Sequence, residues 1–236
     1  MNLYPAIGVA GAVSRTLRPT LPMLAVLLVV VAACRSREPA PGDSVAVEHT
    51  APGSTLRVAI LGDPDDARIQ PVREAIDHWN SELARLGLHV QLDSGAIAKV
   101  PVPEDAFAAA SAAKLKPWGP LADARLRAAL SDVPGDIVIG LSKTDLISFA
   151  VPWRSGRKGI VGVRRSDVLP LALPNTVRNV VAHEIGHVIG LSHNADSTTL
   201  MCGRPASCRP AAFASDSPHF FPLTAGDEQS LRRRWP

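Results

Sequence analysis

A stretch of eleven residues, HEIGHVIGLSH, constrains the fold of this chain more than any other feature of its sequence. His183 and His187 are four residues apart, so on a helix both imidazoles leave the same face, one turn apart. Gly190 can adopt a positive φ, which ends a helix and turns the chain sharply. His193 is then carried back toward the first two histidines. The stretch therefore predicts a helix, a tight turn and three converging imidazoles.

Three histidine nitrogens at this spacing suit one zinc ion, bound at about 2.0–2.1 Å. Three protein ligands leave a fourth position for water, as in catalytic zinc sites. Glu184 lies beside the first ligand, and we expect it to act as the general base on the attacking water. The alternative is an amphipathic helix with surface histidines. In a chain of this length all five fixed positions would match by chance with a probability on the order of 10⁻⁴.

The spacing H-E-x-x-H-x-x-G-x-x-H resembles that of the metzincin metallopeptidases, which pair it with a methionine in a tight turn beneath the zinc. Met201 follows His193 by eight residues, and the pair Leu200-Met201 is similar to the matrixin branch. Without the motif, Met201 would be interpreted as a core methionine. Weaker similarities lie at residues 73–83, 136–139 and 223–228. The resemblance spans about residues 55–235, but only residues 183–201 are specific.

This resemblance implies a zinc-dependent endopeptidase, a hydrolase with one catalytic Zn²⁺ that acts on proteins or peptides. It also implies an edge strand to which an extended substrate adds. We expect that strand at Gly159, Ile160, Val161, Gly162 and Val163. The wall of the substrate pocket is expected within residues 218–222, where Phe220 and Phe221 are either wall or core residues.

Two other functions stay open. One is a zinc amidase with a narrow substrate, such as a cell-envelope peptide, and the other is a non-catalytic binding lipoprotein that keeps zinc for structure. The intact Glu184 speaks against the second, because a structural site has no use for a base there. The remaining histidines are scattered and are expected to be surface or capping residues: His49, His78, His89 and His219.

The first 33 residues have the pattern of an export signal. They hold Arg15 and Arg18 and no acid, and residues 23–33 form an apolar stretch that is too short to cross a bilayer. The run VAAC, which ends at Cys34, resembles the bacterial lipobox, in which this cysteine is lipidated. Residues 34–54 are rich in Pro, Gly and Ser and are expected to be a tether. The alternatives are a plain cleaved signal and a start at Met23.

The signal predicts an exported protein, lipid-anchored in the bacterial cell envelope on a periplasmic face or at the outer membrane, with a membrane surface as partner. In an oxidising compartment Cys202 and Cys208, six residues apart, would pair in a disulfide. The run CGRP at Cys202 is also similar to the cysteine-switch motif of matrixin pro-segments. Its place after the helix makes that match a coincidence.

Composition excludes several classes of protein. With 236 residues, 46% of them hydrophobic, the chain can form one domain, expected at residues 55–236. Residues 34–236 hold 23 of the 25 basic and all 22 acidic side chains, so their net charge is +1. This balance gives no electrostatic case for binding nucleic acid. The cluster at residues 232–234 is expected to be a solvated tail or the complement of a helix end. We expect a monomer.

The hydrophobic pattern mixes strands and helices, so the fold class is α+β. Strands are predicted at 55–61, 88–92, 97–102, 136–141 and 159–165. Helices are predicted at 67–86, 105–115, 121–130, 175–189 and 225–234, with Asn175 or Thr176 capping the fourth. Together with the resemblance, this predicts a metzincin-like domain: a twisted mixed sheet, an active-site helix and a loop-rich C-terminal subdomain.

Overall fold

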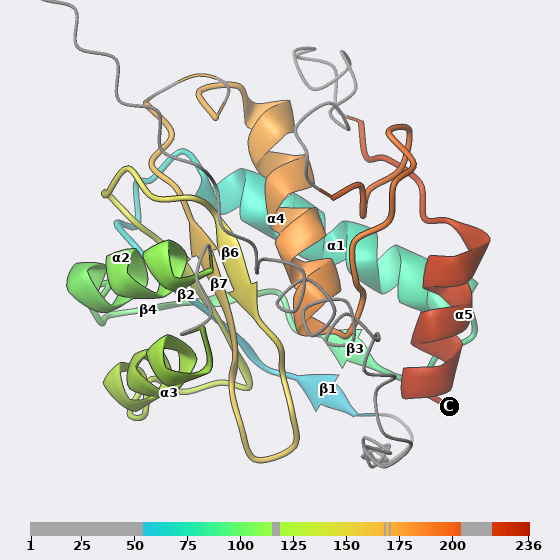
Figure 1. Cartoon of the computed structure of the whole chain (residues 1–236), viewed down its shortest axis with the longest axis horizontal. Helices are drawn as coiled ribbons and strands as arrows, with labels where there is room; N and C mark the ends of the chain where they lie inside the picture. Colours follow the sequence, from blue (N-terminus) through green and yellow to red (C-terminus); the bar gives the residue numbers. More distant parts are fainter. Residues whose placement is uncertain (1–53, 115–118, 168, 170, 204–218) are drawn as a thin grey trace, which may run out of the picture. The chain divides into compact units, whose positions relative to one another are not determined.

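The fold is taken from a computed structural model that describes residues 54–114, 119–167, 169, 171–203 and 219–236 (Figure 1). The predicted signal, Cys34 and the tether lie outside these residues, and so does Cys208. Those predictions therefore stay predictions, including the disulfide. Within the described part of the chain, no helix has the length and apolar character needed to span a membrane.

The central element is a five-stranded mixed sheet in the order β4-β2-β5-β7-β6. Four strands run parallel, and the short edge strand β6 runs antiparallel to β7. The bounds are Val58–Leu61 for β2, Ala96–Ala98 for β4, Ile137–Leu141 for β5, Phe149–Val151 for β6 and Gly159–Val163 for β7. The predicted strand 55–61 is divided at Arg57, and its first part, β1 (Thr55–Leu56), pairs in parallel with β3 (Gln91–Leu92).

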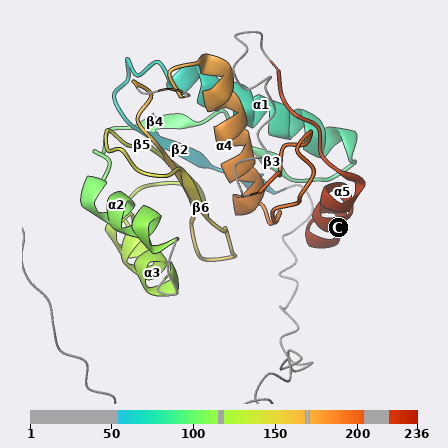
Figure 2. The ribbon, with the colours of Figure 1, turned by 45° about the horizontal axis from the view of Figure 1, so that its top comes forward.

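Helices cover both faces of this sheet (Figure 2). One face carries α1 (Ile69–Arg85) and α4 (Pro174–Val188), and the other carries α2 (Glu104–Ala113) and α3 (Gly119–Ala129). The last helix, α5 (Ala225–Arg234), follows residues 219–224 and starts at a capping box between Thr224 and Asp227. The predicted α+β class with a mixed sheet is confirmed.

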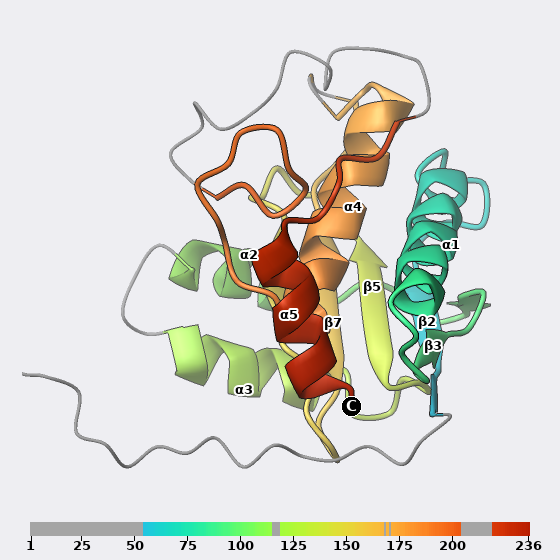
Figure 3. The same ribbon diagram turned by 90° about the vertical axis from the view of Figure 1, so that its right-hand side faces the viewer.

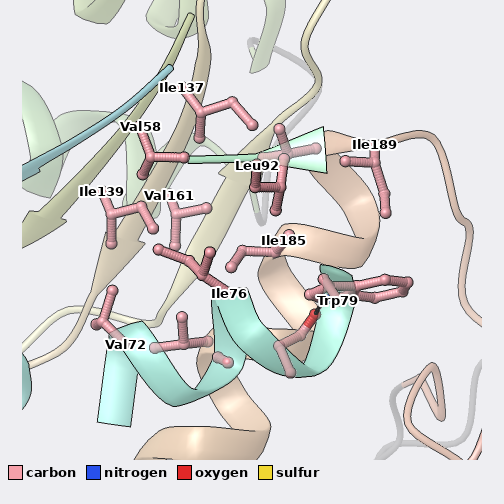
Figure 4. Packing of buried hydrophobic residues seen from close by; sticks show 14 of the residues in the cluster. Val58, Val72, Ile76, Trp79, Leu92, Ile137, Ile139, Val161, Ile185 and Ile189 are labelled. Atoms are coloured by element: carbon pink, nitrogen blue, oxygen red, sulfur yellow. Dashed lines mark hydrogen bonds between the residues drawn. The ribbon is translucent and has the colours of Figure 1, made fainter. Parts of the chain in front are cut away.

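Strand periodicity divides the core in two. Alternate residues such as Val58, Ile60 and Ile139 point to α1 and α4 and form the site-side core. Figure 4 shows Val72, Ile76 and Trp79 of α1 and Ile185 of α4 packed into it. The residues between them point to α2 and α3 and form the far-side core, with members Ala59, Leu61, Val138 and Ile160.

Three predictions about local structure need correction. The strand β6 is not among the predicted elements, because three residues are too few to show an alternating pattern. It covers the outer edge of β7, so Gly159–Val163 lies between β5 and β6 and the prediction of an edge strand there is wrong. The N-cap of α4 is Leu173, followed by Pro174 at the first helical position. Asn175 and Thr176 are therefore helical residues and not caps.

Candidate metal centre

The C-terminal end of α4 shapes the first half of the site. Gly190 has φ +111°, and the amide of Leu191 donates to the carbonyl of Gly186 at 2.8 Å. The amide of Gly190 donates to His187 O at 3.2 Å, which completes a Schellman motif with Gly190 at its left-handed position. The turn brings the carbonyl of Leu191 to 2.9 Å from Nδ1 of His187. The glycine thus ends the helix and helps to orient a histidine on it.

The three predicted histidines converge through their Nε2 atoms. The Nε2 separations are 3.1 Å for His183–His187, 3.2 Å for His183–His193 and 2.9 Å for His187–His193. Nitrogens of a tetrahedral zinc site would be about 3.3–3.4 Å apart, given bonds of 2.0–2.1 Å. Among the described residues, these three form the group of His, Cys, Asp and Glu side chains whose ligand atoms are close enough to share one metal ion.

The hydrogen bonds of the imidazoles decide which nitrogen faces the centre. Nδ1 of His183 lies 2.7 Å from Leu200 O, and Nδ1 of His187 lies 2.9 Å from Leu191 O. A carbonyl only accepts, so each Nδ1 carries the proton and each Nε2 presents a lone pair. Lone pairs that converge in this way suit a cation, and the backbone carbonyls are the outer partners that histidine ligands of zinc use. The residues present therefore fit one Zn²⁺.

Burial also prepares His187 for this role. Removal from water lowers the pKa of His187, and the nearby His193 and Lys114 lower it further, against a smaller opposite effect of the bond to Leu191. Because a metal binds the neutral imidazole, a lowered pKa keeps His187 in its ligand form at neutral pH.

Met201 lies directly beneath the helix turn that carries the ligands. Its side chain is fully buried, and a Cβ on Gly186 would come within 2.6 Å of its sulfur. Gly186 lies between His183 and His187, so the absence of a side chain there lets the methionine approach the backbone. On the same turn, Nε1 of Trp79 donates to the carbonyl of Ala182 at 2.8 Å. Met201 and Trp79 therefore support the two ligands of α4 from below.

Glu184 follows the first ligand on α4 and is 8% exposed. Its position on the ligand-bearing turn is the one that the sequence predicts for a base.

A loop tied through Asn194 supports the third ligand, His193. The amide of Asn194 donates to Met201 O, and the amide of Gly203 donates to Asn194 O, both at 2.8 Å. A Cβ on Gly203 would lie 2.5 Å from Cβ of His193, so the loop packs closely against this histidine. The side chain of Asn194 also donates to Asp227 at 3.1 Å. These bonds join His193, Met201 and the start of α5.

Two asparagines fix the segment 219–221 on α4, one that the sequence predicts only as a possible helix cap, Asn175, and one that it does not single out, Asn179. Asn179 donates to His219 O at 2.6 Å and accepts from the amide of Phe221 at 3.1 Å. Asn175 accepts from the amide of His219 at 3.1 Å. Both asparagines are fully buried. Asn175, Asn179, His183 and His187 follow one another at four-residue intervals, and this spacing is the signal that could have revealed them.

The predicted pocket wall is in part a core element. Phe221 is 4% exposed and belongs to the site-side core. Phe220 stacks on His78 of α1, with ring centroids 4.3 Å apart and planes within 3°. His78 is half-buried in this stack, and burial lowers its pKa. Pro218 lies outside the described residues.

The structure thus brings together His183, His187, His193, Glu184 and Met201 around the turn at Gly190. It does not place Gly159–Val163 at an open edge of the sheet.

Comparisons with known proteins agree with this site. Residues 150–214, about a quarter of the chain, match the family model of the matrixins. The matched segment includes the last two residues of β6, all of β7 and α4, the three histidines and Met201. The resemblance to the matrixins is therefore confirmed there. No curated protein that was compared matches the chain.

Solved structures give weaker likenesses. An archaemetzincin from Methanopyrus kandleri is 20% identical, with a TM-score of 0.46, over 78% of this chain and 96% of that one. Myroilysin is 10% identical, with a TM-score of 0.41, over 80% and 86%. A zinc-dependent peptidase from Methanocorpusculum labreanum is 17% identical, with a TM-score of 0.40, over 75% and 100%.

Proposed function

We propose that this chain, whose residues 150–214 match the matrixins, is a zinc-dependent endopeptidase. The observation that carries the proposal is the convergence of the Nε2 atoms of His183 and His187 on α4 and of His193 in the loop after it, 2.9–3.2 Å apart. Glu184 follows His183 on the same helix. Three protein ligands leave room for reacting groups, which a closed structural site does not. The substrate is a protein or a peptide.

The residues of the site have distinct roles in this proposal. His183, His187 and His193 hold the metal, which when bound polarises the scissile carbonyl and lowers the pKa of water. Glu184 accepts a proton from the attacking water and passes it to the nitrogen of the leaving amine. Met201 and Gly186 keep the ligand-bearing turn in place from below. Each role follows from the position of the side chain on α4 or on the loop after it.

The sheet supplies a place for an extended substrate. Strand β6 packs against α4 and is paired with β7 on one side only. Within the described residues no strand pairs with its other edge, so its backbone can add a peptide by β-augmentation. We assign the substrate edge to Phe149–Val151, in place of the strand 159–163 that the sequence predicts.

The test uses the full chain loaded with zinc and an unfolded generic protein as substrate. Wild type should cleave it, and Glu184→Gln should lose activity by at least about 10²-fold. Zinc content, measured by mass spectrometry of the native protein, should be one ion per chain in both. His193→Ala should lose both zinc and activity. A Glu184→Gln variant that retains full activity would contradict the assigned base.

One result would favour the other two functions. If folded, zinc-loaded wild type cleaves no generic protein, a narrow cell-envelope amidase or a binding lipoprotein remains. Cleavage of peptidoglycan peptides would then separate these two.

The location is also part of the proposal. We propose export and lipid anchoring at Cys34, supported by the lipobox-like run VAAC and the apolar stretch before it. Mass spectrometry of the mature N-terminus should find an acylated Cys34. An N-terminus without lipid would indicate a plain cleaved signal.

A further inference from the structure

The amino ends of the parallel strands carry exposed arginines from elements far apart in the sequence. Arg154 and Arg157 lie on the hairpin between β6 and β7, and Arg232 and Arg233 lie on the last turn of α5. We call these four residues the basic pole. Figures 1 and 3 show the hairpin and the C-terminal end of α5 at the same end of the sheet.

Specific contacts hold the two halves of the basic pole together. Arg234 donates to the carbonyl of Trp153 at 2.8 Å, and the rings of Trp153 and Trp235 stack with centroids 5.4 Å apart. Nε1 of Trp235 donates to Ile189 O at 3.0 Å, which fixes the end of α5 to the end of α4. The basic pole is therefore part of the folded domain and adjoins the helix that carries the metal ligands. Of the two predictions for residues 232–234, the complement of a helix end agrees with their place in the last turn of α5, and the solvated tail does not.

The hairpin places like charges directly opposite each other. Arg154 and Arg157 form an antiparallel bridge, with N–O distances of 3.1 and 2.8 Å around a turn at Gly156. Like charges at opposed positions destabilise a hairpin. A third arginine, Arg127 of α3, donates to Pro152 O at 2.8 Å, and its pKa is affected by the charges of Arg154 and Arg157. Burial lowers the pKa of Arg127, and Arg157 and Arg154 lower it further against the opposite effect of Asp123.

At the carboxyl ends of the parallel strands, by contrast, arginines are paired with carboxylates. There Arg68 pairs with Asp66, Arg164 with Asp145 and Arg165 with Asp167. Among the residues that the structure describes, no carboxylate forms an ion pair with any of the four arginines of the basic pole. Of the acids near this pole, Asp136 pairs with Arg57 and Glu228 pairs with Arg85. The exposed Asp132 accepts from the hydroxyl of Ser131, in a segment whose carbonyls accept from Lys158 of the hairpin. A nearly neutral chain thus concentrates unpaired positive charge at one end.

We propose that the basic pole binds the anionic phosphate headgroups of a lipid bilayer. Guanidinium groups recognise phosphate oxygens by paired hydrogen bonds, and clustered arginines gain from the negative surface potential of such a membrane. The described chain also enters at this pole, because Ser54 and β1 precede the amino end of β2. Cys34 lies 20 residues earlier in the sequence, a reach of about 70 Å at most. The proposed anchor and the basic pole would hold the same end of the domain toward the membrane.

The test is sedimentation of the full chain with vesicles of two compositions at about 0.1 M salt. One is pure phosphatidylcholine, and the other contains 30% phosphatidylglycerol by mole. Apolar insertion of the N-terminal segment or of an acyl chain would promote binding to both kinds of vesicle. The basic pole would promote binding only to the anionic vesicles. The quantity measured is therefore the ratio of the two partition coefficients, which should be at least about tenfold for wild type, given about fivefold per arginine.

Arg154→Glu with Arg157→Glu should reduce this ratio to near one. The matched control is Arg73→Glu with Lys99→Glu, which makes the same change in net charge at exposed residues far from the amino ends of the strands. It should keep the ratio within about twofold. Arg233→Glu alone should lower it by at least about fivefold, since it removes a positive charge and adds a negative one. If charge reversal unfolds the hairpin, seen as a loss of thermal stability, the pair Arg154→Gln and Arg157→Gln takes its place.

Three results would overturn the proposal: a wild-type ratio near one, an equal loss in the control pair, or tighter binding of a DNA duplex than of anionic vesicles. Hydrolysis of soluble casein, measured without vesicles, should be unchanged in the Arg154 and Arg157 variants. Loss of lipid binding can therefore be told apart from failure of the proposed peptidase activity.

Discussion

The two faces of the five-stranded sheet are each covered by helices but are packed in different ways. On the site side, large residues of α1 reach the backbone of α4, and the Trp79 indole donates to Ala182 O at 2.8 Å. On the far side, Phe107 and Phe149 pack edge to face, with ring centroids 5.7 Å apart. A Cβ on either Gly140 or Gly162 would lie 2.3 Å from a phenylalanine ring, and these two glycines are register partners on β5 and β7.

This contrast separates stability from metal binding. A packing defect under α4 lies one helix turn or less from His183 and His187, so it should disturb both the fold and the ligands. A defect at the phenylalanine pair lies across the sheet from the site and should weaken the fold alone. The predictions below test this division, beginning with the largest expected effect.

Trp79→Ala should lower the free energy of unfolding by about 3–5 kcal/mol, because it leaves a cavity under the ligand-bearing turn. The apparent zinc affinity should fall about tenfold, since support behind the ligands is lost. Denaturant unfolding and competition with a zinc chelator measure the two effects. Trp79→Phe is the control, and it should cost less than Trp79→Ala, because it loses the bond to Ala182 and only part of the buried ring volume. Unchanged zinc affinity in Trp79→Ala would break the comparison.

Phe107→Ala should cost about 3–4 kcal/mol, close to the effect of Trp79→Ala, while zinc affinity stays within about twofold of wild type. Gly140→Ala alone should destabilise the protein, because its Cβ would meet the Phe107 ring. In the Phe107→Ala background the same glycine change should be nearly neutral. This coupling in a double-mutant cycle would show that the Phe107 ring packs against the backbone of Gly140. Additive costs, or a large loss of zinc from Phe107→Ala, would refute the division.

Asn179→Ala should cost about 2 kcal/mol, because it removes the buried side chain that accepts from the amide of Phe221 and donates to the carbonyl of His219. It should also change which peptide bonds are cleaved, since residues 219–221 are held on the ligand-bearing helix by this side chain. Asn80→Ala is the matched control, because Asn80 bonds both the amide and the carbonyl of Leu92, each at 2.8 Å. Profiling of cleaved peptides should show a shift for Asn179→Ala and none for Asn80→Ala.

What the sequence predicts well is the part of the site set by local geometry. The helix spacing of His183 and His187 and the positive φ of Gly190 follow from residues within one segment, and the structure shows both. The helix at 225–234 is likewise found at its predicted bounds. Short-range rules suffice there because the hydrogen bonds that decide the conformation join residues a few positions apart.

What the sequence does not predict depends on partners distant along the chain. Asn179 bonds residues 40 and 42 positions away, and the basic pole joins a hairpin to a helix about 80 positions later. Strand β6 is three residues long and is defined by its pairing with β7. The expectation of an edge strand at Gly159–Val163 follows from the family resemblance and not from the apolar residues of that run. Only the tertiary structure shows which edge is open.

Two carboxylates, one on each face, give the smallest expected effects. On the far side, Glu104 of α2 accepts from the hydroxyls of Ser142 and Thr144 and from the amide of Lys143. Burial would raise the pKa of Glu104, but these bonds outweigh it and hold the pKa below its ordinary value of 4.5. On the site side, the bond from Arg178 holds the pKa of Glu74 below the same value. A carboxyl group whose pKa is lowered by folding stabilises the protein at any pH above its ordinary pKa. This stabilisation is lost as the pH falls through the pKa of the folded state.

Glu104→Gln should therefore cost about 1–2 kcal/mol at pH 7, and its difference from wild type should shrink below pH 4.5. Glu74→Gln should show the same sign with a cost of about 1 kcal/mol or less, because this carboxylate is partly exposed and makes fewer bonds. Urea unfolding at several pH values measures both. Because Glu74 joins α1 to α4 through Arg178, its variant should slightly weaken zinc affinity, whereas Glu104→Gln should not. If instead Glu104→Gln weakened zinc affinity and Glu74→Gln did not, changes on the far face of the sheet would affect the metal site.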